Sequence, residues 1–512
     1  MSVLVALLEG REVGVIRQTG GRLSFSYDDP WRTAPGAYPL SLSLPLAAKD
    51  HGHAAINAFL WGLLPDNELI LDRWAKRFHV SARSPFALIG KVGEDCAGAV
   101  QFVTPDQRDS WQNRSRDDVQ WLTEADVADR LRGLQTDVAA WRAPRDTGQF
   151  SLAGAQPKTA LLFDGRRWGV PSGRIPTTHI LKPPTSELDG HVENEHICLA
   201  LARAMGLPAV SSEVRDFGGV KAIVVERYDR VDISGLAAAT AGRAAAKAAE
   251  AAMHAASAAS GSSESAALAA LAAAEAAEAA ASAKSLSEFA DTTKVYRVHQ
   301  EDFCQALGKL PSNKYQSEGG PGPPAIVALL RASAFGGEID HKRGGKSAAD
   351  EDAATFVDAL IFNWLIGGTD GHAKNYSILL GAGGLVRLAP LYDVASILGY
   401  PRIDAEKARL AMKIGGEYWL RDIGPVQWRK CAAELRMDAG VVIERARAMA
   451  DSLPDLLSTE IARAKASGLS HPILRRLCDV LSARARTFPG ASRRISRARI
   501  NRPVSLRRYH SV

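Results

Sequence analysis

Residues 363–393 read NWLIGGTDGHAKNYSILLGAGGLVRLAPLYD. An apolar helical run ends in this stretch at a pair of glycines, and a polar loop then leads into an apolar strand predicted over 376–380. A glycine turn and a second apolar run over 385–391 complete a hairpin. The hairpin predicts that three polar side chains lie at the same end of two adjacent strands, namely Asp370, Asn375 and Asp393.

These three residue types suit phosphoryl transfer. A carboxylate at Asp370 can accept the hydroxyl proton of a phosphate acceptor, while Asn375 and Asp393 offer the oxygen ligands that Mg²⁺ takes when it bridges nucleotide phosphates. Protein kinases place a catalytic Asp and an Asn at this same separation, with a metal-binding Asp further along. A lone D-x-x-x-x-N is usually explained by turn and helix caps. The glycine break, the flanking strands and the second Asp favour a phosphoryl-transfer site here.

The composition is that of a globular protein with at least two domains, with 512 residues of which 46% are apolar and 23% charged. The five cysteines show no C-x-x-C spacing, so neither a disulfide framework nor a zinc site is indicated, and a reducing cytoplasm is expected. The N-terminal apolar run is too short for a signal peptide, and no run is long enough to span a membrane. Residues 487–512 contain seven Arg and no acidic residue, which indicates either a docking tail for nucleic acid or an acidic partner, or only a solvated tail.

Residues 1–105 are predicted to form a strand-rich unit, with a helix that ends in WGLLPDNE at 61–68. Its expected strands are 3–8, 13–16, 23–27 and 99–103. Residues 106–145 are polar and contain three tryptophans, which favours a helical connector to a second domain.

The second domain begins with FSLAGAQPKTALLF at 150–163, which is predicted to form a strand, a loop and a strand. Small residues at 153–155 let backbone N–H groups approach a phosphate, and Lys158 adds positive charge. The G-x-x-x-x-G-K-[ST] phosphate loop is absent, so this segment alone is better explained as a plain hairpin.

A predicted strand in HILKPP, residues 179–184, ends at Lys182. An amphipathic helix over 193–207 follows, with Glu193 and Glu195 in its first turn. Kinases hold the α- and β-phosphates with a strand lysine that is paired to a helical glutamate. Lys182 is therefore the candidate nucleotide lysine, and the alternative is an ordinary exposed strand lysine.

The strand predicted over 222–226 runs into RYDR at 227–230, where a hinge between two lobes would present backbone groups to adenine. Residues 234–293 interrupt this order with an alanine-rich, low-complexity run, which we interpret as an exposed arm that is partly helical or disordered. An amphipathic helix is then expected to start within 298–308, and a Gly/Pro-rich loop over 318–324 precedes the catalytic hairpin. After Asp393 the chain is predicted to be mainly helical to about residue 488.

In this order the sequence resembles the HipA family, the serine/threonine-kinase toxins of bacterial toxin–antitoxin pairs. The motifs that carry the resemblance are SLAGAQPK (151–158), HILKPP, NEHICLALA, VERYDR (225–230), HQEDFCQALG, IGGTDGHAKNYS (366–377) and LAPLYDV (388–394), with LLPDNE in the N-terminal domain. They span most of residues 1–488. The alanine-rich insert and the Arg-rich tail depart from the family pattern.

The resemblance implies an α+β, two-lobed protein-kinase-like fold with a strand-rich N-terminal subdomain and a mainly helical C-terminal lobe. The predicted domains are 1–105, a connector at 106–145, a nucleotide-binding lobe at 146–310 that contains the 234–293 insert, a catalytic lobe at 311–489, and a tail at 490–512. Asp370 would be the catalytic base, and Asn375 and Asp393 would hold Mg²⁺. Ser151 would be an autophosphorylated serine whose modification silences the enzyme. The implied ATP-binding residues are Ala153, Gly154, Ala155, Gln156, Pro157, Lys158, Lys182, Glu226, Tyr228, His372, Lys374, Asn375, Tyr392 and Asp393.

The implied activity is that of an ATP- and Mg²⁺-dependent serine/threonine kinase acting as a toxin. The implied partners are a small helix-turn-helix antitoxin of the HipB type, operator DNA through that antitoxin, and a protein substrate of the aminoacyl-tRNA synthetase class, in particular glutamyl-tRNA synthetase. Two alternatives remain at this point. One is a small-molecule kinase of the aminoglycoside-phosphotransferase type, and the other is a non-catalytic subunit that co-represses transcription.

Overall fold

The computed structural model describes residues 2–113, 117–137, 139–141, 146, 150–185, 188–232, 295–333 and 347–487, with short helical pieces between 245 and 280. The chain divides into a large unit, Met1–Asp229 with Val298–Leu506, and a small unit, Arg230–Arg297. Most of the predicted insert at 234–293 and the whole tail at 490–512 lie outside the described residues. Where the structure describes the chain, no helix has both the length and the apolar character needed to cross a membrane.

The N-terminal part of the large unit is built on a five-stranded antiparallel sheet with the order β4-β3-β2-β1-β5. Its strands are β1 (Ser2–Leu8), β2 (Arg11–Thr19), β3 (Arg22–Tyr27), β4 (Asp50–His51) and β5 (Val100–Val103). The turn between β1 and β2 consists of Glu9 and Gly10 with φ values of 53° and 75°, the left-handed pair that a two-residue hairpin requires. The helices of this part are α1 (Asp29–Arg32), α2 (His53–Gly62), α3 (Glu68–Phe78), α4 (Pro85–Val92) and α5 (Arg108–Gln112).

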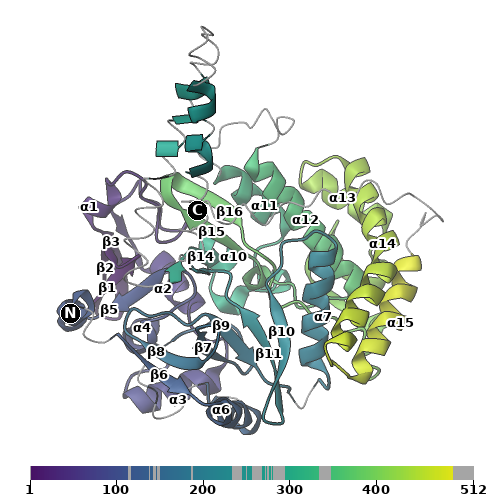
Figure 1. The fold of residues 1–512 in the computed structure, drawn as a ribbon, viewed down its shortest axis with the longest axis horizontal. Coiled ribbons are helices and arrows are strands. Elements are labelled where there is room, and N and C mark those ends of the chain that lie inside the picture. Colours follow the sequence, from purple (N-terminus) through teal and green to yellow (C-terminus); the bar gives the residue numbers. More distant parts are fainter. Residues whose placement is uncertain are drawn as a thin grey trace. The chain divides into compact units, whose positions relative to one another are not determined.

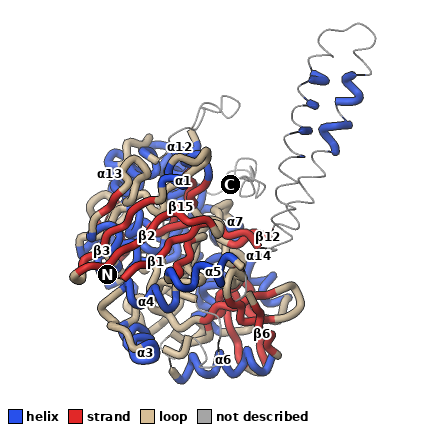
Figure 2. The backbone as a smooth tube through the Cα atoms, turned by 90° about the vertical axis from the view of Figure 1, so that its left-hand side faces the viewer, coloured by secondary structure: helices blue, strands red, loops and turns tan. Residues whose placement is uncertain are grey.

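A six-stranded antiparallel sheet follows, with the order β10-β11-β9-β7-β8-β6. Its strands are β6 (Asp118–Leu122), β7 (Thr159–Phe163), β8 (Trp168–Ser172), β9 (His179–Lys182), β10 (Ser212–Phe217) and β11 (Val220–Glu226). Helices α6 (Glu124–Thr136) and α7 (His191–Ala204) belong to this part. Figure 2 shows β1–β3 and β6 in separate groups of strands.

Two expectations are wrong in part in this region of the chain. The connector predicted as helical contains the helices α5 and α6, but also β6, a short and only partly buried strand that pairs with β8 at the edge of the second sheet. The segment before β7 forms no strand, and Gly154 makes only an isolated bridge to Pro65.

The C-terminal part is mainly helical around a three-stranded sheet with the order β14-β15-β16. These strands are β14 (His299–Asp302), β15 (Ser377–Gly381) and β16 (Leu385–Leu388), and the helices are α10 (Phe303–Ala306), α11 (Pro323–Ala332), α12 (Ala348–Ile366), α13 (Pro425–Glu434), α14 (Ala439–Ala466) and α15 (Pro472–Arg486). Figure 1 shows α7 between the β10–β11 pair and the helices α14 and α15.

The expected helix within 298–308 is partly wrong, because His299–Asp302 pairs with β15 as a strand and only the next four residues are helical. The expectation of helix after Asp393 also missed the hairpin of β17 (Arg409–Ile414) and β18 (Glu417–Trp419). In the small unit, β12 (Arg230–Asp232) pairs with β13 (Val295–Arg297).

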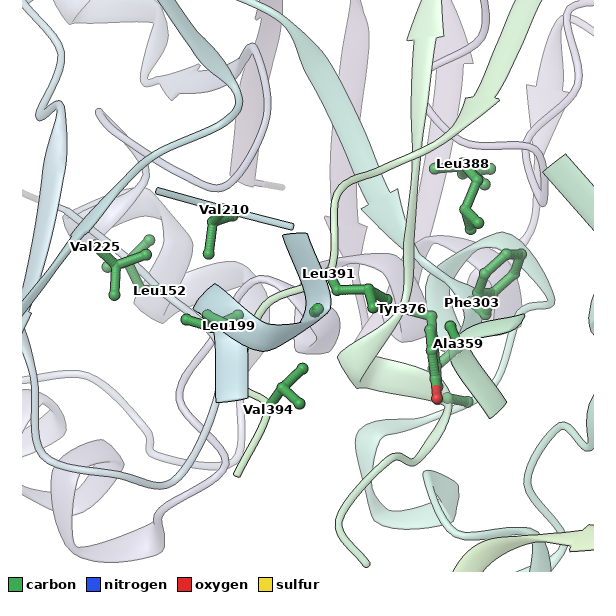
Figure 3. Close-up of a cluster of buried hydrophobic side chains, with 14 of the residues drawn as sticks. Leu152, Leu199, Val210, Val225, Phe303, Ala359, Tyr376, Leu388, Leu391 and Val394 are labelled. Atoms are coloured by element: carbon green, nitrogen blue, oxygen red, sulfur yellow. The ribbon is translucent and has the colours of Figure 1, made fainter. Parts of the chain in front are cut away.

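A continuous apolar core joins the second sheet to the catalytic hairpin. Figure 3 shows Leu391 between Val210 and Leu199 on one side and Tyr376 on the other. Leu391 also makes two backbone hydrogen bonds to the segment before β10, at 2.8 Å to the Pro208 carbonyl and at 2.9 Å from the Val210 N–H. These contacts hold the chain on both sides of the residues predicted to bind nucleotide. The α+β fold class predicted from the sequence is confirmed.

Candidate nucleotide-binding and catalytic site

A cavity of about 840 Å³ opens between the second sheet and the catalytic hairpin. It is lined by every residue that the sequence predicted for catalysis, ATP binding and metal binding, from Ala153 to Asp393, with the exception of the predicted modification site Ser151. Residues far apart in the sequence thus converge on one hollow of the size that small-molecule ligands occupy. Their individual roles remain predictions.

The loop over 367–375, which carries the predicted catalytic residues and is called the catalytic loop below, is positioned by the end of α12. That helix ends at Gly367 with φ 67°, where a Cβ would lie 2.5 Å from Leu398, so only glycine fits this close turn. The Asn375 side-chain amide donates a 2.7 Å hydrogen bond to the backbone carbonyl of Asp370. Asn375 thus stabilises the turn, and its Oδ1 remains the oxygen that a cation would meet if the predicted metal role holds.

Lys182 joins the two sides of the cavity. Its ammonium group lies 2.8 Å from Glu195 of α7 and also pairs with Asp393. Burial works against its charge, but these two carboxylates outweigh it and raise the pKa of Lys182 well above the ordinary value. The residue is only 5% exposed, which excludes the alternative of an ordinary exposed strand lysine.

Asp393 is held in an unusual conformation. Its φ of 57° is left-handed, which costs of order 1 kcal/mol for a residue other than glycine. Burial disfavours its charge, but Lys182 and Lys158 outweigh that effect and keep the pKa of Asp393 far below its usual range. The buried neighbours Leu391 and Val394 anchor the chain on either side of it (Figure 3).

The loop over 153–158 folds back on itself. Lys158 donates a 2.7 Å hydrogen bond to the Ala153 carbonyl, and its ammonium group lies 5.2 Å from the centre of the Trp141 ring. Gly154 has a φ of 101°, and a Cβ there would approach the Lys158 ammonium to 2.6 Å. Burial lowers the pKa of Lys158 to about 8. An anionic phosphate beside Lys158 would favour the protonated form of its amine and raise its pKa again.

The predicted adenine hinge follows β11. Arg227 is buried and forms a 2.9 Å ion pair with Asp229, whereas Tyr228 lines the cavity and its hydroxyl donates to Gln300 at 2.6 Å. The Tyr228 ring stacks on Tyr392 with centres 5.7 Å apart. The two aromatic faces form one apolar wall for a flat ligand.

The sequence analysis did not predict a cluster of charged residues that also lines the cavity. Asp66, which follows α2, lies 2.8 Å from Lys374 and 3.0 Å from Lys314. Burial opposes the charge of Asp66, but the two lysines prevail and lower its pKa. Asp66 belongs to the LLPDNE motif, which the sequence analysis quoted for the family resemblance. That motif is the feature of the sequence that could have pointed to Asp66. Lys374 accordingly reaches the cavity with its charge already paired.

Ser151 lies just outside the cavity and is fully buried. Its hydroxyl donates to the Leu63 carbonyl at 2.7 Å, and its N–H donates to the Asp95 carbonyl at 2.9 Å. The predicted modification site is therefore packed against the N-terminal part in this conformation of the loop.

Comparisons with known proteins agree with this geometry. A family model described as the HipA-like C-terminal domain matches residues 150–295 and 289–457, and one described as the HipA N-terminal domain matches residues 4–103. The putative kinase Y4mE of Sinorhizobium fredii is 32% identical over 464 residues, which cover 90% of this chain and 91% of that protein. The serine/threonine-protein kinase toxin HipA of Shewanella oneidensis is 26% identical over 447 residues, 86% of this chain and 85% of that protein.

Among solved structures, HipA of Shewanella oneidensis, determined in a complex with HipB and its operator DNA, has a TM-score of 0.66 at 23% identity. The match covers 95% of this chain and 97% of that chain, so the two share a fold over nearly their whole length. The resemblance inferred from the motifs, and with it the two-lobed kinase-like fold, is confirmed. By family models, relatives and fold together, the chain belongs to the HipA family and is an enzyme of the kinase class.

Proposed function

We propose that this chain is an ATP- and Mg²⁺-dependent serine/threonine-protein kinase and the toxin of a toxin–antitoxin pair. The observation that carries the proposal is the Lys182 ammonium group, which pairs with both Glu195 and Asp393 in the cavity that Asp370 also lines. A lysine–glutamate pair beside two further carboxylates is what phosphoryl transfer from a nucleotide needs. The relative named as a serine/threonine-protein kinase toxin supports the same activity.

The donor set fits magnesium that arrives with a nucleotide. The described residues contain no group of three His, Cys, Asp or Glu side chains that could hold a metal by themselves. Mg²⁺ commonly takes one or two protein ligands together with phosphate oxygens and water, so Asn375 and Asp393 suffice. When bound, the ion would neutralise charge that develops on the transferred phosphoryl group.

The chain's own residues would divide the remaining work. Lys158, Lys182 and the backbone of 153–158 bind phosphates, and the wall of Tyr228 and Tyr392 with the nearby Glu226 holds the base. Asp370 takes the proton of the acceptor hydroxyl as the new O–P bond forms. His372 and Lys374 border the same space. Burial lowers the pKa of His372, which favours the neutral form of that imidazole beside the Asp370 carboxylate.

Self-inactivation through Ser151 is part of the proposal. The serine is buried against Leu63 and Asp95, so it can receive a phosphate only when its loop leaves this position. A phosphoserine carries about two negative charges at neutral pH and cannot return to the buried site unpaired. The loop would then stay away from the nucleotide phosphates, and the kinase would be silent.

The proposed partners are a HipB-type antitoxin, operator DNA reached through it, and a protein substrate of the aminoacyl-tRNA synthetase class, glutamyl-tRNA synthetase in particular. The solved complex of the Shewanella oneidensis relative with HipB and operator DNA supports the first two. The substrate class rests on the family resemblance. The match of residues 4–103 to the family's N-terminal domain argues against a small-molecule kinase.

The test compares the wild-type chain with Asp370→Asn and Asp393→Asn, using labelled Mg-ATP and glutamyl-tRNA synthetase with its tRNA. Asp370→Asn should lower phosphoryl transfer by at least about 100-fold because the proton has no acceptor, while ATP binding stays measurable. Asp393→Asn should lose the Mg²⁺ dependence of ATP binding. Near-wild-type transfer by Asp370→Asn would disprove the role of this residue, and labelling of another protein from a lysate would replace the proposed substrate.

A further inference from the structure

The carboxylate of Asp370 has a partner that the motifs did not indicate. The hydroxyl of Tyr315 donates a 2.6 Å hydrogen bond to Asp370 Oδ1. The Tyr315 ring also meets the His372 ring edge-to-face, with centres 4.9 Å apart. Tyr315 lies 55 positions before Asp370, in a loop between two short 3₁₀ helices, Pro311–Asn313 and Gln316–Glu318. One side chain therefore touches two residues of the catalytic loop.

The loop that carries Tyr315 is fixed to its surroundings at three further places. The Lys314 carbonyl accepts a 3.3 Å hydrogen bond from the Ala373 N–H, and Lys314 shares the carboxylate of Asp66 with Lys374. The Gln316 side chain accepts a 2.7 Å hydrogen bond from the Lys413 N–H of β17. A tyrosine held in this way belongs to a rigid support and not to a swinging lid.

Asp370 needs such a support. Its side chain is 70% exposed, so packing restrains it little. A hydrogen bond to Oδ1 fixes the plane of the carboxylate and leaves Oδ2 for an acceptor hydroxyl. Burial and the contact with Asp370 raise the pKa of Tyr315 well above the ordinary value, so its hydroxyl keeps its proton and remains a donor across the neutral range.

We propose that Tyr315 is the positioning residue of the catalytic base, holding Asp370 so that Oδ2 faces the hydroxyl to be phosphorylated. This inference rests on the proposed kinase function. A competing interpretation is that the Tyr315 hydroxyl occupies the place of the acceptor and must be displaced by it. The fixed contacts of Lys314 and Gln316 favour positioning, because a residue that has to move away would not be anchored on both sides.

The experiment uses Tyr315→Phe, which removes the hydroxyl and keeps the ring against His372. The full chain is given Mg-ATP and a synthetic peptide of residues 146–163, which presents the Ser151 hydroxyl, and both ADP and phosphopeptide are measured. We expect kcat to fall about tenfold, because the carboxylate loses its fixed orientation. The KM and Kd for ATP should change less than about twofold, since Tyr315 does not line the nucleotide cavity.

Tyr418→Phe is the matched control, since Tyr418 lies on β18, next to β17, and its ring packs against Arg409 at 5.0 Å and Lys413 at 5.2 Å instead of against the catalytic loop. It should keep wild-type kcat. An unchanged or faster Tyr315→Phe enzyme overturns the inference, and a faster one identifies the acceptor-blocking role instead. An equal loss in both variants overturns it as well. If the wild-type chain forms ADP no faster than Asp370→Asn, the proposed function itself has failed, which is a different result from an active wild type with an unaffected Tyr315→Phe.

Discussion

Lys158 is a candidate phosphate-binding residue whose charge changes close to the working pH. It is enclosed by Trp141 and by the backbone of its own loop, and burial lowers its pKa to about 8, although Asp393 acts in the opposite direction. Lys182 in the same cavity behaves differently, because it touches two carboxylates and its pKa is raised. The two lysines that we assign to phosphate binding therefore respond differently as the pH rises.

This difference predicts a pH dependence for ATP binding. A lowered pKa means that Lys158 loses its proton as the pH passes about 8, and the neutral amine attracts phosphate less. From pH 7 to pH 9 the Kd for ATP should rise about tenfold, with proton uptake on binding seen by calorimetry in two buffers. Lys158→Arg, which stays charged, should bind with a Kd that is nearly constant over this range.

Lys221→Arg is the control for that measurement, because Lys221 pairs with Glu193 at 3.4 Å and its side chain is 42% exposed. This variant should keep the wild-type pH dependence. A wild-type Kd that does not change between pH 7 and pH 9 would contradict the assignment of Lys158 to the phosphates.

At the scale of elements, the loop over 150–158 is attached to the N-terminal part of the large unit. It has no strand before it, and it is attached by Ser151 to Leu63 and Asp95 and by a bridge between Gly154 and Pro65. These attachments lead to the N-terminal part and not to β7. A change at Ser151 therefore acts on the position of the whole loop.

We predict opposite results for two substitutions at Ser151. Ser151→Ala removes one buried hydrogen bond, costs about 1 kcal/mol of stability and should bind ATP as the wild type does. Ser151→Asp places an unpaired carboxylate at a fully buried position, which should expel the loop and weaken ATP binding by at least about tenfold. Titration of phosphatase-treated proteins with ATP measures both.

Ser24→Asp, at an exposed position of β3, controls for the added charge and should leave the ATP affinity unchanged. Equal affinities of Ser151→Ala and Ser151→Asp would argue against loop expulsion. The absence of phosphate on Ser151 after incubation with Mg-ATP would remove the self-inactivation step from the proposed function.

At the scale of the large unit, Asp66 connects the N-terminal part to the catalytic loop. It lies 308 positions before Lys374, and it is the closest carboxylate to that buried lysine, since Asp302 is 4.0 Å away. The N-terminal part thus supplies the counter-charge for a side chain that borders the nucleotide cavity. If the two parts separated, the buried charge of Lys374 would be left with only the more distant carboxylate of Asp302.

Asp66→Asn should therefore destabilise the chain by about 3 kcal/mol, because breaking a buried ion pair leaves a charge without its partner. The measurement is the Tm and the denaturant midpoint of the full chain, and phosphoryl transfer should fall as the catalytic loop loses its support. Asp29→Asn, which breaks an exposed pair with Lys49, should leave the Tm nearly unchanged. A Tm for Asp66→Asn equal to that of Asp29→Asn would contradict this account.

Much of the site follows from short-range patterns. The five-residue spacing of Asp370 and Asn375, the glycine break before them and the two apolar runs after them fix a loop and a hairpin, because each depends on backbone preferences within a few residues. The order of the motifs was enough to identify the family. The strands at 118–122 and 299–302 were missed, because a short, partly exposed edge strand and a four-residue strand that is buried on both faces show little of the alternation that predicts a strand.

The partners of the charged groups did not follow from those patterns. Both Glu193 and Glu195 were candidates for Lys182, and the docking of α7 on the sheet turned Glu195 towards it and Glu193 towards Lys221. Asp66 with Lys374, and Tyr315 with Asp370, are pairs between distant segments. Such contacts depend on how separate elements pack, and local periodicity carries no information about that packing, so these supports of the site became visible only in the folded chain.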